Sequence, residues 1–100
     1  MSNVSLCDIT VNKIFAVNRM NTPKKKISHV CENRKLCALV CKLEGMSIYK
    51  TVGKSYILDN HHIMLLLRDS SYSIDYIEEG EFIIVEFECN QEYTEQGICN

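Results

Sequence analysis

The sequence predicts an all-β protein of short antiparallel strands, and two observations indicate this fold class. First, short apolar segments between Leu36 and Cys89 are separated by turn-forming residues such as Glu44-Gly45 and Asp59-Asn60. Second, polar and apolar side chains alternate in the segments SIYKTV and YSIDYI, as they do in a strand with one buried face. Short strands divided by turns at such close spacing are typical of an antiparallel meander, a sandwich or a small barrel.

Composition and charge limit the class of protein. A chain of 100 residues, 46% hydrophobic and 24% charged, is expected to form one domain over residues 1–100. Its net charge of −2 gives no general attraction to phosphate backbones, so we expect no direct contact with nucleic acid. No apolar run approaches the roughly 18 residues of a membrane-spanning helix, and the N-terminus lacks the pattern of a secretory signal. We therefore expect a cytoplasmic protein that does not contact the membrane.

Six cysteines are present, but their spacing does not indicate a disulfide framework or a zinc site. There is no C-x-x-C pair, and the nearest two cysteines, Cys37 and Cys41, are four residues apart. On a strand this spacing places both side chains on one face roughly 13 Å apart, which is too far for a disulfide. We expect reduced thiols that pack as small apolar side chains, with metal binding or redox chemistry as the alternative.

The N-terminal part of the chain predicts one strand and a loop before the main block of strands. The segment Asp8–Val17 has the pattern of a strand. Four of its apolar side chains are expected to face a core: Ile9, Val11, Phe15 and Val17. The lysine triplet at residues 24–26 follows a proline and has no interleaved aromatic residue, which indicates a solvated turn rather than a phosphate site.

The middle of the chain predicts a buried strand followed by a tight hairpin. Residues 36–43 are almost continuously apolar, so we expect them to be buried on both faces. Glycine supplies the positive φ that a two-residue hairpin turn requires, which places a turn at Val52-Gly53. That turn would pair Tyr49 with Tyr56 on one face of the sheet and Ile48 with Ile57 on the other.

Three further strands are predicted in the C-terminal half, and each is preceded by a turn. They are His62–Leu67, Tyr72–Ile77 and Glu81–Glu88. The polar tail that follows has no helical periodicity, so we expect it to be loose or to form an edge segment.

The order of small, aromatic and apolar positions resembles a known family over residues 34–89. The sequence is similar to the N-terminal cupin-type sensor domain of AraC-family transcription regulators. The matching positions are Leu39–Leu43, Gly45, Tyr49, Gly53, Lys54–Leu58, Ile63–Leu67, Tyr72 and Gly80–Phe87. Two departures are that the usual Pro-x-Gly-Asp-like turn is Asp59–His62 here, and that the DNA-binding helix-turn-helix half is absent from this sequence.

This resemblance implies both a fold and a function. The implied fold is a cupin-like barrel, also described as a jelly roll or double-stranded β-helix. The implied function is the effector-sensing and self-association domain of an AraC-type regulator, which binds a small molecule inside the barrel and is not an enzyme. Two alternatives are a stand-alone metal-dependent cupin enzyme and a filled barrel that acts only as a dimerisation module.

A small-molecule pocket combines apolar walls with a few polar groups, and several side chains at or beside the predicted strands have this character. Glu86 interrupts an apolar run, and a buried carboxylate needs a partner. Arg34 is either that partner or a clamp for the ligand; in the other interpretation Glu86 faces solvent on an edge strand. The candidate ligand-binding residues are Arg34, Tyr49, Tyr56, Tyr72 and Glu86, with Tyr76 as a further tyrosine of this kind.

The histidines of this chain do not match the metal site of cupin enzymes. Cupin enzymes hold a metal with a His-x-His pair, a nearby Glu and a distant His, whereas this chain has only His29, His61 and His62. Adjacent strand residues point to opposite faces, so His61 and His62 cannot both bind one ion, and we expect neither a metal nor another cofactor.

Unpaired strand edges at Asp8–Val17 and at the C-terminal strand favour a homodimer with two-fold symmetry.

Overall fold

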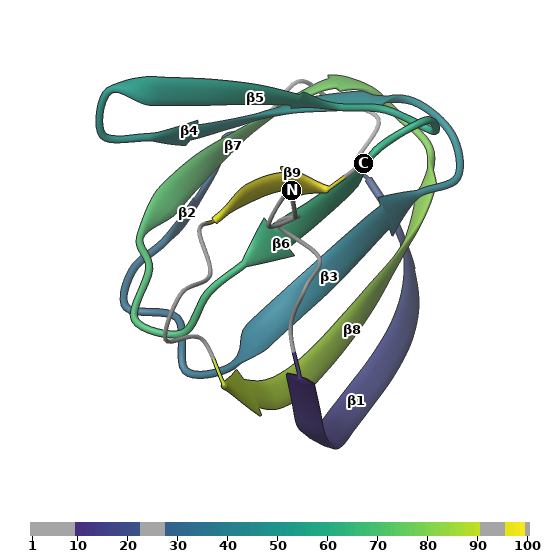
Figure 1. The fold of residues 1–100 in the computed structure, drawn as a ribbon. Coiled ribbons are helices and arrows are strands. Elements are labelled where there is room, and N and C mark those ends of the chain that lie inside the picture. Colours follow the sequence, from purple (N-terminus) through teal and green to yellow (C-terminus); the bar gives the residue numbers. More distant parts are fainter. Residues whose placement is uncertain (1–9, 23–27, 91–95, 100) are drawn as a thin grey trace, which may run out of the picture.

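The computed structural model describes residues 10–22, 28–90 and 96–99, and within these ranges the chain forms strands and no helix. The strands lie in two facing sheets (Figure 1). Among the described residues, therefore, no helix is long and apolar enough to cross a membrane. The predicted all-β class is confirmed.

Nine strands are described, and every pairing between them is antiparallel. Their bounds are β1 (Thr10–Asn21), β2 (Ser28–Cys31), β3 (Cys37–Lys42), β4 (Met46–Thr51), β5 (Lys54–Leu58), β6 (Ile63–Leu66), β7 (Tyr72–Glu78), β8 (Glu81–Asn90) and β9 (Gly97–Cys99). One sheet has the order β1-β8-β3-β6-β9 and the other the order β2-β7-β4-β5.

The pairing is that of one long hairpin rolled up on itself. Its tip is the β4–β5 pair, and moving outward along the chain β3 pairs with β6, β2 with β7 and β1 with β8. This nested order is the jelly roll, as predicted. Hydrogen bonding does not continue from one sheet to the other in the described ranges, so the barrel is not closed and the molecule is a two-layer roll.

The hairpin at the tip has the register predicted from its glycine. Tyr49 lies opposite Tyr56, and Ile48 lies opposite Ile57. Gly53 has a φ of 77°, a left-handed conformation that glycine adopts without steric cost. Tyr49 is 4% exposed and Ile57 is 55% exposed, so the tyrosines face the interior and the isoleucines face outward.

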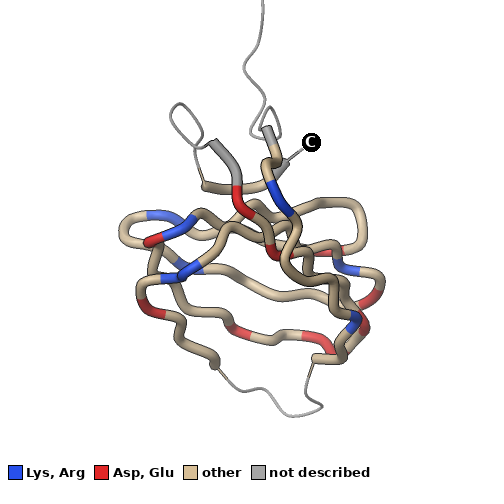
Figure 2. The backbone as a smooth tube through the Cα atoms, turned by 90° about the horizontal axis from the view of Figure 1, so that it is seen from below, with Lys and Arg blue, Asp and Glu red and all other residues tan. Residues whose placement is uncertain are grey.

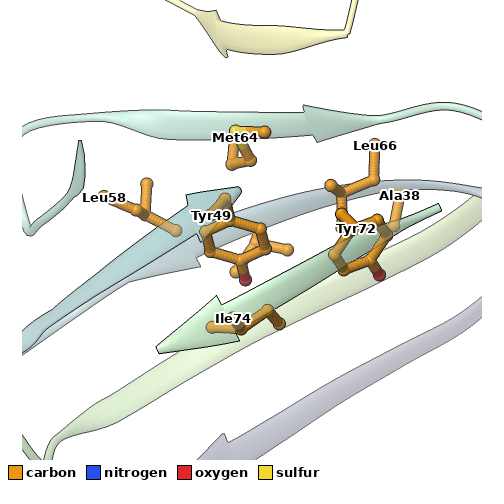
Figure 3. Close-up of a cluster of buried hydrophobic side chains, with 8 residues drawn as sticks. Ala38, Tyr49, Leu58, Met64, Leu66, Tyr72 and Ile74 are labelled. Atoms are coloured by element: carbon orange, nitrogen blue, oxygen red, sulfur yellow. The ribbon is translucent and has the colours of Figure 1, made fainter. Parts of the chain in front are cut away.

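The main core lies between the sheets and is built from alternate residues of the facing strands (Figure 3). Fully burying a side chain such as Leu66 contributes about 1.5–3 kcal/mol. The buried members of this core are Ala38, Val40, Tyr49, Leu58, Met64, Leu66, Tyr72 and Ile74. A smaller buried cluster of Cys37, Leu65 and Phe87 is formed by the intervening residues, which point to the other face of the five-stranded sheet because successive strand residues alternate.

Two turns interlock at one end of the roll, and glycine is required in both. A Cβ on Gly80 would overlap the carbonyl oxygen of Glu44, and a Cβ on Gly45 would lie 2.5 Å from the carbonyl oxygen of Glu79. Thr22 joins the same contact, since its hydroxyl accepts a hydrogen bond from the Gly80 N–H at 2.7 Å. The turn before β4 and the turn before β8 are therefore held together by direct backbone contact.

The burial predicted for the first strand is wrong. Val11, Phe15 and Val17 are 43%, 48% and 61% exposed, and Ile9 and Asp8 lie outside the described residues. The reason is position: β1 is the edge strand of its sheet and pairs only with β8. The lysine triplet at residues 24–26 also lies outside the described residues.

Three of the cysteines and many of the charged residues can be placed within the described ranges. Cys31, Cys37 and Cys41 are not in disulfides, and Cys7 lies outside the described residues. Cys37 and Cys41 lie on β3 as the spacing predicted. Acidic and basic residues are interspersed over the described backbone rather than separated by sign (Figure 2).

Candidate ligand-binding site

A cavity of about 320 Å³ lies between the two sheets. Its inner wall is apolar and comes from four strands, with Val40 on β3, Leu66 on β6, Ile74 on β7 and Ile84 on β8. Its outer lip is formed by the adjacent edge strands β1 and β2, through the exposed residues Met20, Asn21 and His29. These residues come from both sheets, so the space that they line lies between the two layers.

The strand period explains why aromatic side chains enter this cavity. Inward positions of β7 fall two residues apart, at Tyr72, Ile74 and Tyr76, and those of β8 include Phe82 and Ile84. Because the β-strand alternates faces, the polar residues between these positions point away from the cavity. The tyrosines thus add both apolar surface and hydroxyl groups to the wall.

The backbone around Arg34 is fixed by two adjoining loops. Asn33 and Asp69 have φ values of 50° and 68°, a region that non-glycine residues seldom occupy. The Arg34 N–H donates to the carbonyl of Ser70 at 2.9 Å, and the Asp69 N–H donates to the carbonyl of Arg34 at 2.6 Å. Strained backbone held in this way is a common feature of functional sites, and here it places Arg34 at the wall of the cavity.

The side chain of Arg34 is 11% exposed, and two nitrogens of its guanidinium form hydrogen bonds within the chain. Nη1 donates to the hydroxyl of Tyr72 at 3.1 Å, and Nη2 donates to Oε2 of Glu86 at 2.9 Å. Nε is buried and has no hydrogen-bond partner among the described residues. Glu86 lies on β8, between β1 and β3, so the predicted partnership with Arg34 is present and the edge-strand interpretation is wrong.

Tyr49 and Tyr72 stand side by side with their ring centroids 5.8 Å apart. Their hydroxyl groups point the same way (Figure 3). Burial raises the pKa of Tyr72 to about 12, and burial also raises the pKa of Tyr49. Both hydroxyls therefore remain protonated at neutral pH, and the hydroxyl of Tyr72 also forms a hydrogen bond with Cys31.

The structure brings together three of the five candidate residues at the cavity. Arg34, Tyr49 and Tyr72 line it, as does Tyr76. Glu86 is not part of the lining and reaches the site through Arg34. Tyr56 also lies outside the lining, and its hydroxyl donates to the carbonyl of Gln96 at 3.3 Å.

Lys42 is a further polar residue beside the cavity, and sequence reasoning missed it. It is 5% exposed, and its Nζ donates to the hydroxyl of Ser47 at 2.7 Å. The same nitrogen lies 5.8 Å from the ring centroid of Tyr76 and 5.4 Å from that of Phe82. Burial lowers the pKa of Lys42 to about 8. The sequence did contain a signal for its burial: Lys42 follows the buried Val40 by two residues on β3, so both side chains point to the same face.

The two adjacent histidines belong to a turn and a strand entry, as predicted. A carboxylate oxygen of Asp59 accepts from the backbone N–H of His61 at 2.9 Å and lies 2.7 Å from Nδ1 of His62. The strand β6 begins at the next residue, Ile63. Across the described ranges, no group of three or more His, Cys, Asp or Glu side chains is placed to hold a metal ion.

Comparison with known proteins gives a fold likeness and no family assignment. No family model matches the chain, and no curated protein matches it. The structure is similar to that of wild-type ToxT from Vibrio cholerae strain SCE256, solved with an unsaturated fatty acid bound, with a TM-score of 0.60 and 16% sequence identity. The likeness covers 79% of this chain and 31% of the ToxT chain. At this identity the likeness shows that the rolled pair of sheets in this chain has the fold of one part of ToxT.

Proposed function

We propose that this chain is the effector-sensing domain of an AraC-type transcription regulator and that it binds a small molecule between its two sheets. The observation that carries the proposal is the cavity, with Arg34 held at its wall by two strained loops. The resemblance of residues 34–89 to AraC-family sensor domains supports it. So does the fold likeness to ToxT, itself an AraC-family regulator.

The polar groups suggest how an effector would be oriented. Arg34 and Tyr49 offer hydrogen-bond donors, while the remaining wall is mainly aliphatic and aromatic. A ligand with an acceptor oxygen at that end and an apolar body matches this arrangement. Glu86 would act indirectly, by holding the guanidinium of Arg34 in one orientation.

Ligand titration followed by amide chemical shifts tests the proposal. Because the ToxT structure holds an unsaturated fatty acid, palmitoleate is a suitable first probe. We expect shifts concentrated on β7, β8 and the loop of Arg34. The variant Ile84→Trp fills the cavity and should abolish these shifts, whereas Ile57→Trp, on the exposed outer face of β5, should leave them unchanged. Equal shifts in the wild type and Ile84→Trp would show that the cavity is not the binding site.

Self-association is the second part of the proposal. The edge strand β1 pairs on one side only, and beyond its irregularities at residues 11–16 it is regular to Asn21. Ile14 and Val17 are 59% and 61% exposed on this strand. An exposed strand edge with apolar side chains favours pairing with a second copy, most simply about a two-fold axis.

A further inference from the structure

The outer face of the five-stranded sheet, which points away from the cavity, carries apolar side chains across four neighbouring strands. Val85 lies opposite Val17 on one side and opposite Leu39 on the other. Leu39 in turn lies opposite Leu65. Residues directly opposite each other share one face of a sheet, so these four side chains form one row. The exposed or half-buried members of this surface, here called the outer apolar face, are Ile14, Val17, Leu39, Ile63, Ile83 and Val85.

The outer face of the four-stranded sheet is different, because polar side chains lie within it. Lys50 lies opposite Ser73 on β7 and opposite Ser55 on β5. Its Nζ is 2.6 Å from a carboxylate oxygen of Asp75 on the same face. A sheet face in contact with water usually carries polar residues of this kind. The outer apolar face lacks them, so it has the composition of a buried surface.

Part of the outer apolar face is nevertheless open to solvent. Val17 and Ile14 on β1 are 61% and 59% exposed, and Ile63 on β6 is 37% exposed. Ile14 belongs to this face because it lies opposite Phe87. Among the described strands none lies over this face, since the four-stranded sheet packs against the opposite one (Figure 1). Contiguous exposed apolar surface of this kind marks a contact with another molecule.

Arg19 and Glu81 form a charged pair at the rim of the outer apolar face. Nη2 of Arg19 donates to Oε1 of Glu81 at 2.9 Å. Along β8 the next residues that point outward are Ile83, Val85 and Phe87, and none of them is charged. Two copies of these rows can therefore approach each other without bringing unpaired like charges together, which would disfavour association.

We propose that the occupant of the outer apolar face is a second copy of this chain, packed sheet against sheet about a two-fold axis. The inference rests on the self-association part of the proposed function and assigns it a specific surface. Side chains of a strand stand roughly perpendicular to the sheet, so pairing along the edge of β1 would leave Ile14 and Val17 in solvent. Packing of the two faces buries them instead. Stacked sheets keep their strands within about 30° of each other because both are twisted, and a second copy supplies the same twist and the same apolar rows.

The size of the outer apolar face predicts a weak dimer. Four strands at a spacing of about 4.8 Å, over residues 83–87 of β8, give a flat area of roughly 20 Å by 17 Å. Stable interfaces bury about 800 Å² on each partner. The face is smaller than this, so we expect monomer and dimer to be in equilibrium at high protein concentration.

Sedimentation velocity of the full chain, over a concentration series to several hundred micromolar, tests the proposal with three lysine variants. Ile63→Lys changes β6, which β8 and β3 separate from the edge strand β1, so it should disrupt face packing and leave edge pairing intact. We expect its dimer dissociation constant to rise at least about tenfold, since a lysine would be desolvated in the interface. Val17→Lys lies on both the edge and the face and should act similarly. Ile57→Lys, on the exposed outer face of β5, is the matched control and should dimerise as the wild type does.

The possible results separate this inference from the rest of the proposed function. If Val17→Lys weakens the dimer and Ile63→Lys does not, the copies pair along β1, and the face-to-face arrangement is wrong although self-association stands. An equal loss in Ile57→Lys also overturns the arrangement, because that residue lies on the other sheet. A strictly monomeric wild type overturns self-association and this inference together, while ligand binding in the cavity is decided by its own titration.

A second measurement uses the wild type alone and so does not depend on the folding of a variant. The methyl resonances of Leu39, Ile63 and Val85 should shift as the wild type is concentrated, whereas those of Ile57 should stay constant. Concentration-dependent shifts confined to the amides of β1 would contradict packing through the outer apolar face.

Discussion

Arg34 and Glu86 form an ion pair at 2.9 Å across the interior edge of the roll, although 51 residues lie between them in the sequence. Arg34 comes from the loop after β2, and Glu86 from the middle of β8. The arginine side chain is almost fully buried, whereas the carboxylate is partly exposed to solvent. The main effect of the pair is therefore to hold the guanidinium in one orientation. It joins the loop that holds Arg34 to β8, an interior strand of the larger sheet that lies between β1 and β3.

Arg34→Ala should therefore destabilise the protein. The change removes the bonds to Glu86 and Tyr72 and leaves the partly exposed carboxylate of Glu86 without its cation, at an expected cost of about 1–3 kcal/mol. Urea unfolding at pH 7 measures the loss. Arg19→Ala breaks a pair with Glu81 that is exposed on the surface and should change stability little. Equal losses in the two variants would mean that the Arg34 pair has no special structural role.

Gly80→Ala should be more destabilising than Gly53→Ala. A methyl group at Gly80 would overlap the backbone of Glu44, which cannot move without separating two turns. At Gly53 the methyl group meets nothing within 4 Å, and the cost there comes from its φ of 77° alone, about 1–2 kcal/mol. Thermal unfolding of the two variants side by side tests this order. A smaller loss at Gly80 would show that the turns before β4 and β8 are not rigidly interlocked.

Lys42→Met should stabilise the protein at pH 7 and alter its dependence on pH. Burial lowers the pKa of Lys42 from 10.5 to about 8. Between these values the unfolded chain binds more protons than the folded one, so the stability of the wild type rises with pH in this window. Below pH 8 Lys42 is charged in the folded protein, so the cost of burying its charge is fully present. Replacing it with methionine should raise the free energy of unfolding by roughly 1–3 kcal/mol.

Urea unfolding of both proteins at pH 7 and at pH 9.5 measures this effect. The difference between wild type and variant should shrink at the higher pH. The pKa values of Tyr49 and Tyr72 are raised, so these residues make stability fall, not rise, with increasing pH. This fall begins only above about pH 10, where the tyrosines of the unfolded chain ionise. If the free energies of unfolding of the wild type and Lys42→Met differ by the same amount at both pH values, Lys42 is not a buried, protonated group.

The wild type should form a weak dimer through β1. Val17→Lys places a charge on the exposed edge strand and should shift the equilibrium to monomer, as charged residues do on natural sheet edges. Ile57→Lys introduces the same charge on the exposed face of β5 and is the control. Light scattering over a concentration series to several hundred micromolar gives the mass. A strictly monomeric wild type at the highest concentration would exclude association by this chain alone.

Local signals in the sequence were sufficient for most of the fold. The glycine at position 53 fixed the register of the hairpin, so that Tyr49 opposite Tyr56 followed from the turn geometry alone. Alternation identified β7, and the continuous apolar run identified β3. The pairing of Arg34 with Glu86 was accessible as one of two interpretations, because a carboxylate within an apolar strand needs a partner.

Properties that depend on the packing of the two sheets could not be obtained in this way. The apolar residues of β1 have the pattern of buried positions, but their exposure depends on which strand lies at the edge of the sheet. Lys42 was missed because lysine is seldom buried without an acid beside it. Tyr49 and Tyr56 share one face, yet only Tyr49 lines the cavity, since the space that remains between two sheets is set by all their side chains together.

The nested pairing of the strands has a consequence for the order of events during synthesis. Thr10 pairs with Asn90, and Asn21 pairs with Glu81, so the larger sheet joins residues from near the two ends of the chain. Contacts of such long sequence separation form slowly, on the millisecond to second scale, and the ribosome releases the N-terminal strands first. A nascent chain that has not yet released β8 lacks Phe82, Ile84 and the partner of Arg34 together. The cavity should therefore gain its complete wall only after β8 has left the ribosome, and the binding proposed here should then be absent from shorter nascent chains.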